Sequence, residues 1–155
     1  MGYIEELRAL VGHKPIILVG VAVLVINDEY ELLLQRKRDG TWAIPGGFME
    51  LGESAEDTGR REIAEETGLR LGNMRLIGVF SGEEHFVRLA NGDEYYPVTI
   101  AFITNEITGG CLKADGEEGT EVRFFKPTEL PADFNPKIKE LILKNVEQVL
   151  FSEMF

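Results

Sequence analysis

The chain has 155 residues, of which 44% are hydrophobic, so it can bury one sizeable core but is too short for two domains of ordinary size. Its formal net charge of -11 argues against a partner that is a nucleic-acid polymer, because such binding depends on Lys and Arg side chains that neutralise phosphates. A single cysteine excludes an internal disulfide, and the longest apolar run, residues 15–26, is too short to cross a bilayer, so we expect a cytoplasmic protein with no membrane partner.

Hydrophobic periodicity and turn residues predict the elements along the chain. A turn at Asn27 predicts that the strand after it forms a hairpin with the strand before it. The Pro45-Gly46-Gly47 segment is expected to break the chain where the backbone takes conformations forbidden to other residues. The predicted helices cover residues 3–10, 54–67 and 137–151, and the predicted strands cover residues 16–26, 32–34, 42–44, 74–80, 84–89, 96–104 and 122–125.

Strands with helices on both sides predict an α/β (α+β) fold, an α/β/α sandwich with a mixed sheet between the helices. The chain contains no internal repeat or linker, so we expect one domain over residues 1–155. Whether that domain forms a homodimer stays open.

The helix predicted between Ser54 and Gly68 carries carboxylates on its apolar face. Ser54 is a good N-cap and Gly68 a good C-terminal residue. At about 100° per residue, Glu62 and Glu66 share one arc with apolar residues, and Glu65 lies just beyond the edge of that arc. Burying carboxylates together costs several kcal/mol unless a positive charge sits beside them. A cation is therefore expected at this face.

Glutamates at positions i, i+3 and i+4 suit a hard divalent ion such as Mg²⁺, for which Mn²⁺ can substitute. The ordinary alternative for a Glu-rich helix is a solvated acidic face that pairs with Arg60 and Arg61. The helix alone leaves both interpretations open.

The segment around this helix resembles the Nudix box. Residues 47–69 read GFMELGESAEDTGRREIAEETGL, and every defined position of that motif is matched. The lead-in over residues 42–47 and the segment over residues 124–131 also resemble the family. The resemblance identifies the chain as a MutT-like Nudix hydrolase and implies the Nudix-like α/β/α sandwich.

Carried over position by position, the resemblance also implies roles for residues. It makes Arg61 and Glu53 the pair that holds the preceding loop to the helix. Glu118, in an acidic loop before the strand at residues 122–125, becomes a metal ligand or the general base, and Glu62 is the other candidate for that base. An exposed acidic loop is the ordinary alternative for Glu118. The implied metal ligands are Glu62, Glu65, Glu66 and the carbonyl of Gly46.

The implied reaction is hydrolysis of a nucleoside diphosphate linked to another group, in which a glutamate takes a proton from water. Arg36 and Arg38 could meet the phosphates, and Trp42, Phe48 or Tyr95 could stack on the base. Each of these five side chains has an ordinary alternative, a solvated charge or a core aromatic. Gly59 departs from the family habit of Ala at that position, at a cost of about 1 kcal/mol of helix stability.

The sequence narrows the choice of substrate only through marker residues that it lacks. The proline that marks many ADP-ribose-cleaving relatives and the tyrosine that marks diadenosine-polyphosphate-cleaving relatives are replaced near those places by Glu84 and Phe86. A compact (d)NTP pyrophosphohydrolase that releases a nucleoside monophosphate is therefore expected. The alternatives are an ADP-ribose, nucleotide-sugar or dinucleoside-polyphosphate hydrolase, and a non-catalytic nucleotide-sensing module.

Overall fold

The computed structural model describes residues 2–132, 134, 140, 142 and 144. Within these residues no helix is both long enough and apolar enough to span a membrane. The elements, in chain order, are α1 (Tyr3–Val11), β1 (Ile16–Val25), β2 (Leu32–Lys37), β3 (Trp42–Ala43), β4 (Gly46–Phe48), α2 (Ala55–Thr67), β5 (Leu69–Leu71), β6 (Arg75–Phe80), the 3-10 helix η1 (Glu83–His85), β7 (Val87–Arg88), β8 (Glu94–Thr104), β9 (Ile107–Gly110) and β10 (Gly119–Phe125).

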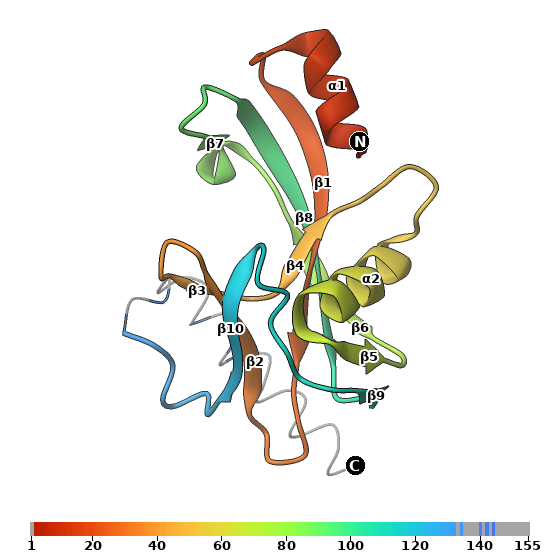
Figure 1. The fold of residues 1–155 in the computed structure, drawn as a ribbon, viewed down its shortest axis with the longest axis vertical. Helices are drawn as coiled ribbons and strands as arrows, with labels where there is room; N and C mark the ends of the chain where they lie inside the picture. Colours follow the sequence, from red (N-terminus) through yellow and green to blue (C-terminus); the bar gives the residue numbers. More distant parts are fainter. Residues whose placement is uncertain (1, 133, 135–139, 141, 143, 145–155) are drawn as a thin grey trace.

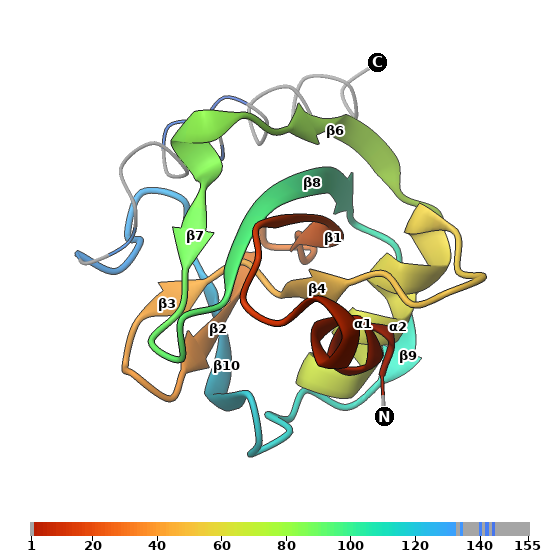
Figure 2. The same ribbon diagram turned by 90° about the horizontal axis from the view of Figure 1, so that it is seen from above.

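The central sheet has the strand order β4-β1-β8-β6, and β7 pairs with the outer part of β8 (Figure 1). β1 and β8 run parallel, from Ile16 opposite Tyr95 to Val25 opposite Thr104, whereas β4, β6 and β7 join antiparallel. Figure 2 shows β6, β8 and β1 one behind another, with α2 on the β4 side. The expected α+β fold with a mixed sheet is confirmed.

The hairpin expected between the first two strands is wrong. The turn at Asn27 is present, but only one bridge, between Ile26 and Leu32, joins the two strands. β1 pairs with β8 along its whole length and with β4 at residues 20–22, and beyond the single bridge β2 diverges from it. Instead, β2 pairs with β10 and β3 in a second, three-stranded sheet.

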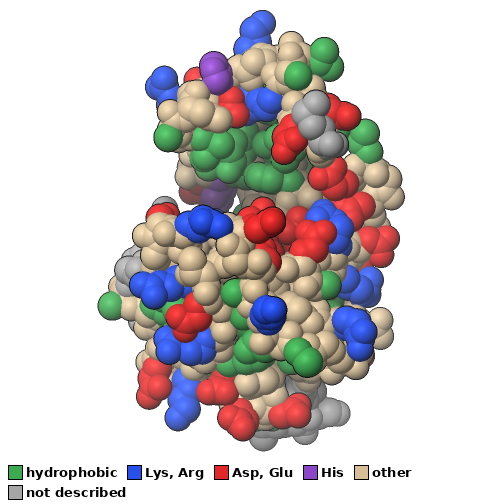
Figure 3. Space-filling model, in the orientation of Figure 1, with side chains coloured by type: hydrophobic (Ala, Val, Ile, Leu, Met, Phe, Trp, Pro, Cys, Tyr) green, Lys and Arg blue, Asp and Glu red, His purple; other side chains and the backbone are tan. Residues whose placement is uncertain are grey.

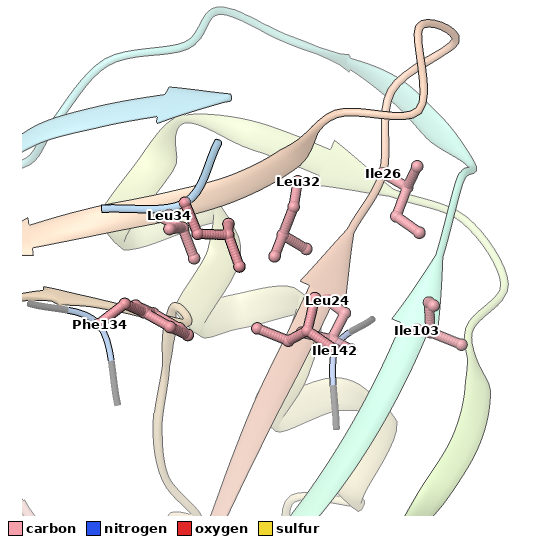
Figure 4. Packing of buried hydrophobic residues seen from close by; sticks show 8 residues of the cluster. Leu24, Ile26, Leu32, Leu34, Ile103, Phe134 and Ile142 are labelled. Carbon is pink, nitrogen blue, oxygen red and sulfur yellow. The ribbon is translucent and has the colours of Figure 1, made fainter. Parts of the chain in front are cut away.

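Two apolar clusters hold these layers together. One fills the space between β1 and β2 and includes buried side chains of residues 134 and 142 near the end of the described chain (Figure 4). The other lies under α2, where Ile63 is fully buried against Val21 and Val23 of β1. Packing of α2 against β4, β5 and β1 therefore fixes the position of the carboxylate helix relative to the central sheet.

Several expected boundaries shift. The strand expected over residues 84–89 is reduced to β7, because the 3-10 helix η1 occupies the residues before it. β10 begins at Gly119, three residues before its expected start, and the β5–β9 pair was not expected. The helix expected over residues 137–151 lies outside the described residues, except that Glu140, Ile142 and Lys144 have helical backbone.

Candidate active site

The helix α2 begins and ends as its sequence predicts. The Ser54 hydroxyl accepts a hydrogen bond from the Asp57 amide at 3.0 Å, and Gly68 ends the helix in the left-handed conformation with φ 79°. The buried face of α2 includes Glu62, which is 9% exposed, and Glu66, which is 2% exposed. Two acids thus lie on the face that packs toward the sheet.

The glycines before α2 act through close approach rather than through unusual backbone angles. The chain breaks between β3 and β4 at residues 44–45, but Gly46 and Gly47 belong to strand β4 and are absent from the glycines with positive φ, so the unusual backbone expected there is wrong. A Cβ atom on Gly47 would lie 2.3 Å from the Glu62 carboxyl carbon, and one on Gly46 would lie 2.1 Å from the Val21 carbonyl oxygen. The Gly46 amide also donates to the Glu66 carboxylate at 3.1 Å. Only glycine lets β4 lie this close to the acids.

Three carboxylates converge beside β4. Glu62, Glu66 and Glu118 each offer one oxygen, and these oxygens lie within 4.8 Å of one another. Mg²⁺ binds oxygen at about 2.1 Å, so two ligands of one ion lie roughly 3 to 4 Å apart. The separation of the three carboxylates therefore fits a divalent cation, and the bare Gly47 backbone leaves the space that the Glu62 carboxylate occupies.

The charges of these acids are strongly perturbed. Burial, followed by hydrogen bonds with Glu118 and Glu62, raises the pKa of Glu66 to about 10. Burial also raises the pKa of Glu62, although Glu66 and Arg61 act in the opposite direction. At neutral pH the pair holds a proton in the absence of another cation, since two buried carboxylates repel each other. A divalent cation would supply the missing positive charge.

Arg61, on α2, connects the helix to the loop between β4 and α2, which we call the box loop. Its guanidinium forms a two-pronged ion pair with Glu53, with donor–acceptor distances of 2.7 and 2.9 Å, and also donates to the Phe48 carbonyl at 3.1 Å. Its remaining terminal nitrogen reaches Glu62 at 2.9 Å and Glu65 at 3.2 Å. The ion pair between Arg61 and Glu53 lowers the pKa of the Glu53 carboxyl to about 2 and raises the pKa of the Arg61 guanidinium. The pair joins loop and helix, as the resemblance implies.

Glu65 stands apart from the three converging acids. Its side chain is 59% exposed, and Arg61 is its ion-pair partner. Its role as a metal ligand stays a prediction.

Glu118 is exposed and lies in a short loop between β9 and β10. The Arg38 side chain reaches this loop: its Nε donates to the carbonyl of Glu117, and its Nη2 donates to the carbonyl of Gly116 at 2.6 Å. Arg38 was expected at the substrate phosphates, and the structure places its guanidinium on the backbone that leads to Glu118.

The other side chains expected at the substrate make contacts of their own. Arg36 is exposed and makes a long contact of 3.4 Å with the Gly40 carbonyl. Trp42 stacks edge-on against Phe125 with ring centroids 4.8 Å apart, and Phe48 stacks edge-on against Tyr95 at 5.6 Å. Figure 3, drawn in the orientation of Figure 1, shows a hollow in the side of the molecule that faces the viewer, with hydrophobic side chains above it and charged side chains below.

Two residues near Glu118 were missed by the sequence analysis. Asp115 accepts hydrogen bonds from three successive backbone amides, a pattern that its place before Gly116 could have suggested. Gln35 is 3% exposed, and its Nε2 is the one buried side-chain nitrogen or oxygen without a partner in the described part of the chain. That nitrogen lies 2.6 Å from where a Cβ on Gly119 would be, so Gln35 packs directly under the loop. No sequence signal indicates this contact.

Comparison with known proteins places these features in a family. Residues 17–144 match the model of the NUDIX domain. A Bacillus subtilis protein provisionally assigned as an 8-oxo-dGTP diphosphatase is 35% identical over 79% of this chain and 76% of that protein. An ADP-ribose pyrophosphatase of Methanocaldococcus jannaschii is 38% identical over 73% of this chain and 64% of that protein.

Solved structures agree at the level of the fold. The crystal structure of a MutT NUDIX hydrolase from Burkholderia pseudomallei matches with a TM-score of 0.66 and 23% identity, over 88% of this chain and 98% of that one. The family match covers the central sheet, the carboxylate helix and the loop that carries Glu118. This chain therefore belongs to the Nudix hydrolase family.

Proposed function

We propose that the chain hydrolyses the diphosphate bond of a nucleoside diphosphate derivative, with Mg²⁺ as the cofactor and a nucleoside triphosphate as the preferred substrate. The convergence of Glu62, Glu66 and Glu118 within 4.8 Å is the observation that carries the proposal. When bound, a divalent cation neutralises the diphosphate and makes water more acidic. A protein of net charge -11 needs such a cation to attract a polyphosphate.

The residues of the chain divide the work. Glu62 and Glu66 hold the cation from the helix, with Glu65 and the Gly46 carbonyl as further ligands. Glu118 takes the proton from the attacking water, because it is the exposed member of the three and water can reach it. The Arg61–Glu53 pair keeps the box loop against the helix. Arg36, Trp42 and Phe48 are the candidates for binding the rest of the nucleotide.

The preference for a nucleoside triphosphate rests on the missing substrate markers and on the relative that is assigned to 8-oxo-dGTP. ADP-ribose is the second candidate, because the relative that carries that name is 38% identical. Either substrate is a small nucleotide that a cytoplasmic enzyme would meet, and a homodimer is compatible with both.

A substrate panel tests the proposal. kcat/KM is measured for dNTPs, oxidised dNTPs, ADP-ribose, nucleotide sugars and dinucleoside polyphosphates at one fixed Mg²⁺ concentration. We expect the highest ratio for a nucleoside triphosphate. A clearly higher kcat/KM for ADP-ribose would make ADP-ribose the preferred substrate and leave the proposed hydrolysis of a diphosphate bond unchanged. Binding of nucleotides without turnover would identify a sensing module instead.

A further inference from the structure

Glu118 lies on a loop, outside any helix or strand, yet its carboxylate meets two acids that a helix holds in place. A general base must keep a defined position relative to the attacking water, because small displacements reduce the rate strongly. Something other than regular secondary structure must therefore orient the backbone at Glu118.

The two peptide units that precede Glu118 are bonded at both of their polar ends. In the first unit, the Gly116 carbonyl accepts from Arg38, and the Glu117 amide donates to Asp115. In the second unit, the Glu117 carbonyl accepts from Arg38, and the Glu118 amide donates to Asp115 at 3.1 Å. Since a peptide unit is planar, bonds on opposite sides fix the orientation of its plane.

Arg38 is suited to this task. Its guanidinium donates from a rigid plane, so two bonds to neighbouring carbonyls set a direction as well as a distance. It reaches the loop from the turn after β2, across 78 and 79 residues of sequence. Two of its donors are thus committed to the backbone of the loop, which leaves them unavailable to a phosphate.

We propose that Arg38 is a positioning residue that, together with Asp115, orients Glu118 for the hydrolysis. The proposal deepens the function proposed above and rests on it. It differs from the phosphate-binding role that the sequence suggested for Arg38, because it places the effect of Arg38 on the chemical step and not on substrate binding.

The kinetic test uses Arg38→Ala, with Lys37→Ala as the matched control that removes the same charge from the neighbouring residue. We expect Arg38→Ala to lower kcat at least about 10-fold while KM changes less than about 2-fold, the pattern of a misplaced catalytic group. Lys37→Ala should leave both constants near the wild type. A large rise in KM with kcat unchanged, or an equal loss of kcat in Lys37→Ala, would overturn the proposal.

A double-mutant cycle tests whether Arg38 acts through Glu118. In the Glu118→Gln background, Arg38→Ala should lower kcat less than about 2-fold, because the group that it positions is already lost. Losses that multiply independently would contradict the proposal. Asp115→Ala approaches the same peptide units from the other side and should reproduce the Arg38→Ala pattern, which keeps the test decisive if Arg38→Ala folds poorly.

Hydrogen exchange gives a readout that needs no substrate. The amides of Glu117, Glu118 and Gly119 should exchange faster in Arg38→Ala than in the wild type, whereas amides of α2 should be unchanged. Unchanged exchange in the loop would overturn the proposal even if activity falls. If the wild type cleaves no diphosphate in the substrate panel, the proposed function fails, but the exchange result still decides whether Arg38 orders the loop.

Discussion

The helix carboxylates and the loop carboxylate of this site are held in opposite ways. Glu62 and Glu66 are buried on α2, where helix and sheet fix their positions and burial raises the pKa of both carboxyls. Glu118 is exposed, and hydrogen bonds to its backbone hold it instead. The difference suits the two tasks proposed for these acids, because binding of a cation needs carboxylates held in fixed positions and a general base needs a carboxylate that water can reach.

Removal of divalent cations should have the largest effect, because Glu62 and Glu66 of α2 are proposed to act only through a bound cation. EDTA should abolish hydrolysis, and Mg²⁺ or Mn²⁺ should restore it. A cation that binds only the folded state also stabilises that state, so the unfolding temperature should rise on titration with Mg²⁺ in the absence of substrate. Full turnover in metal-free buffer would contradict the proposal that the glutamates of α2 bind a cation that hydrolysis needs.

Glu66→Gln should lower kcat by about 100-fold or more, since the amide keeps the volume but loses the charge that would bind the cation. The same change should stabilise the metal-free protein at pH 8, because it removes a buried carboxylate whose pKa is about 10. We expect a rise of at least about 3 °C in the unfolding temperature in EDTA, measured by calorimetry. Glu56→Gln, on the exposed side of α2, is the control and should alter neither quantity.

Glu118→Gln should lower kcat by roughly 10-fold to 100-fold with little change in KM, because a base acts mainly in the transition state. Unlike Glu66→Gln, it should leave the metal-free stability nearly unchanged, since Glu118 is exposed. Glu121→Gln, three residues along in β10, is the comparison. If Glu121→Gln carries the kinetic loss and Glu118→Gln carries none, the base is assigned to the wrong residue.

The smallest effect expected concerns the dependence of stability on pH. The pKa of Glu53 falls from 4.5 to about 2 beside Arg61, so its stabilisation is present above pH 4.5 and is lost as the pH falls toward 2. The raised pKa of Glu66 has the opposite sign: Glu66 stays protonated in the metal-free fold but ionises in the unfolded chain, so the stability of the fold decreases as the pH rises from 4.5 toward 10. The free energy of unfolding is measured by chemical denaturation in EDTA at a series of pH values. Glu53→Gln should flatten its pH dependence only on the acid side, and Glu66→Gln only on the alkaline side.

The parts of the site that the sequence predicts are those that depend on local chemistry. Helix α2 has a recognisable N-cap at Ser54 and a terminating Gly68, and the spacing of Glu62 and Glu66 puts both on one face. The Nudix pattern adds the Glu53–Arg61 pair, which lies within the same short segment. Local rules suffice here because each partner is within eight residues of the other.

The parts that the sequence misses depend on partners far along the chain. Gly46 and Gly47 read as flexible backbone, whereas their real constraint is the proximity of Val21 and Glu62. The β2 strand follows a hairpin turn, yet the sequence does not show that its partner is β10, far along the chain. Arg38 reads as a free cation because its carbonyl partners are 78 and 79 residues away. Nothing local distinguishes these cases.

The pairing of β10 with β2, from Gly119 opposite Lys37 to Phe125 opposite Leu32, has a consequence for how the site assembles during synthesis. Helix α2 leaves the ribosome well before β10, and contacts between distant segments form late in folding. The loop that carries Glu118 can therefore be clamped to Arg38 only after the part of the chain that forms α2 has long been made. The three carboxylates can converge only once β10 has paired with β2.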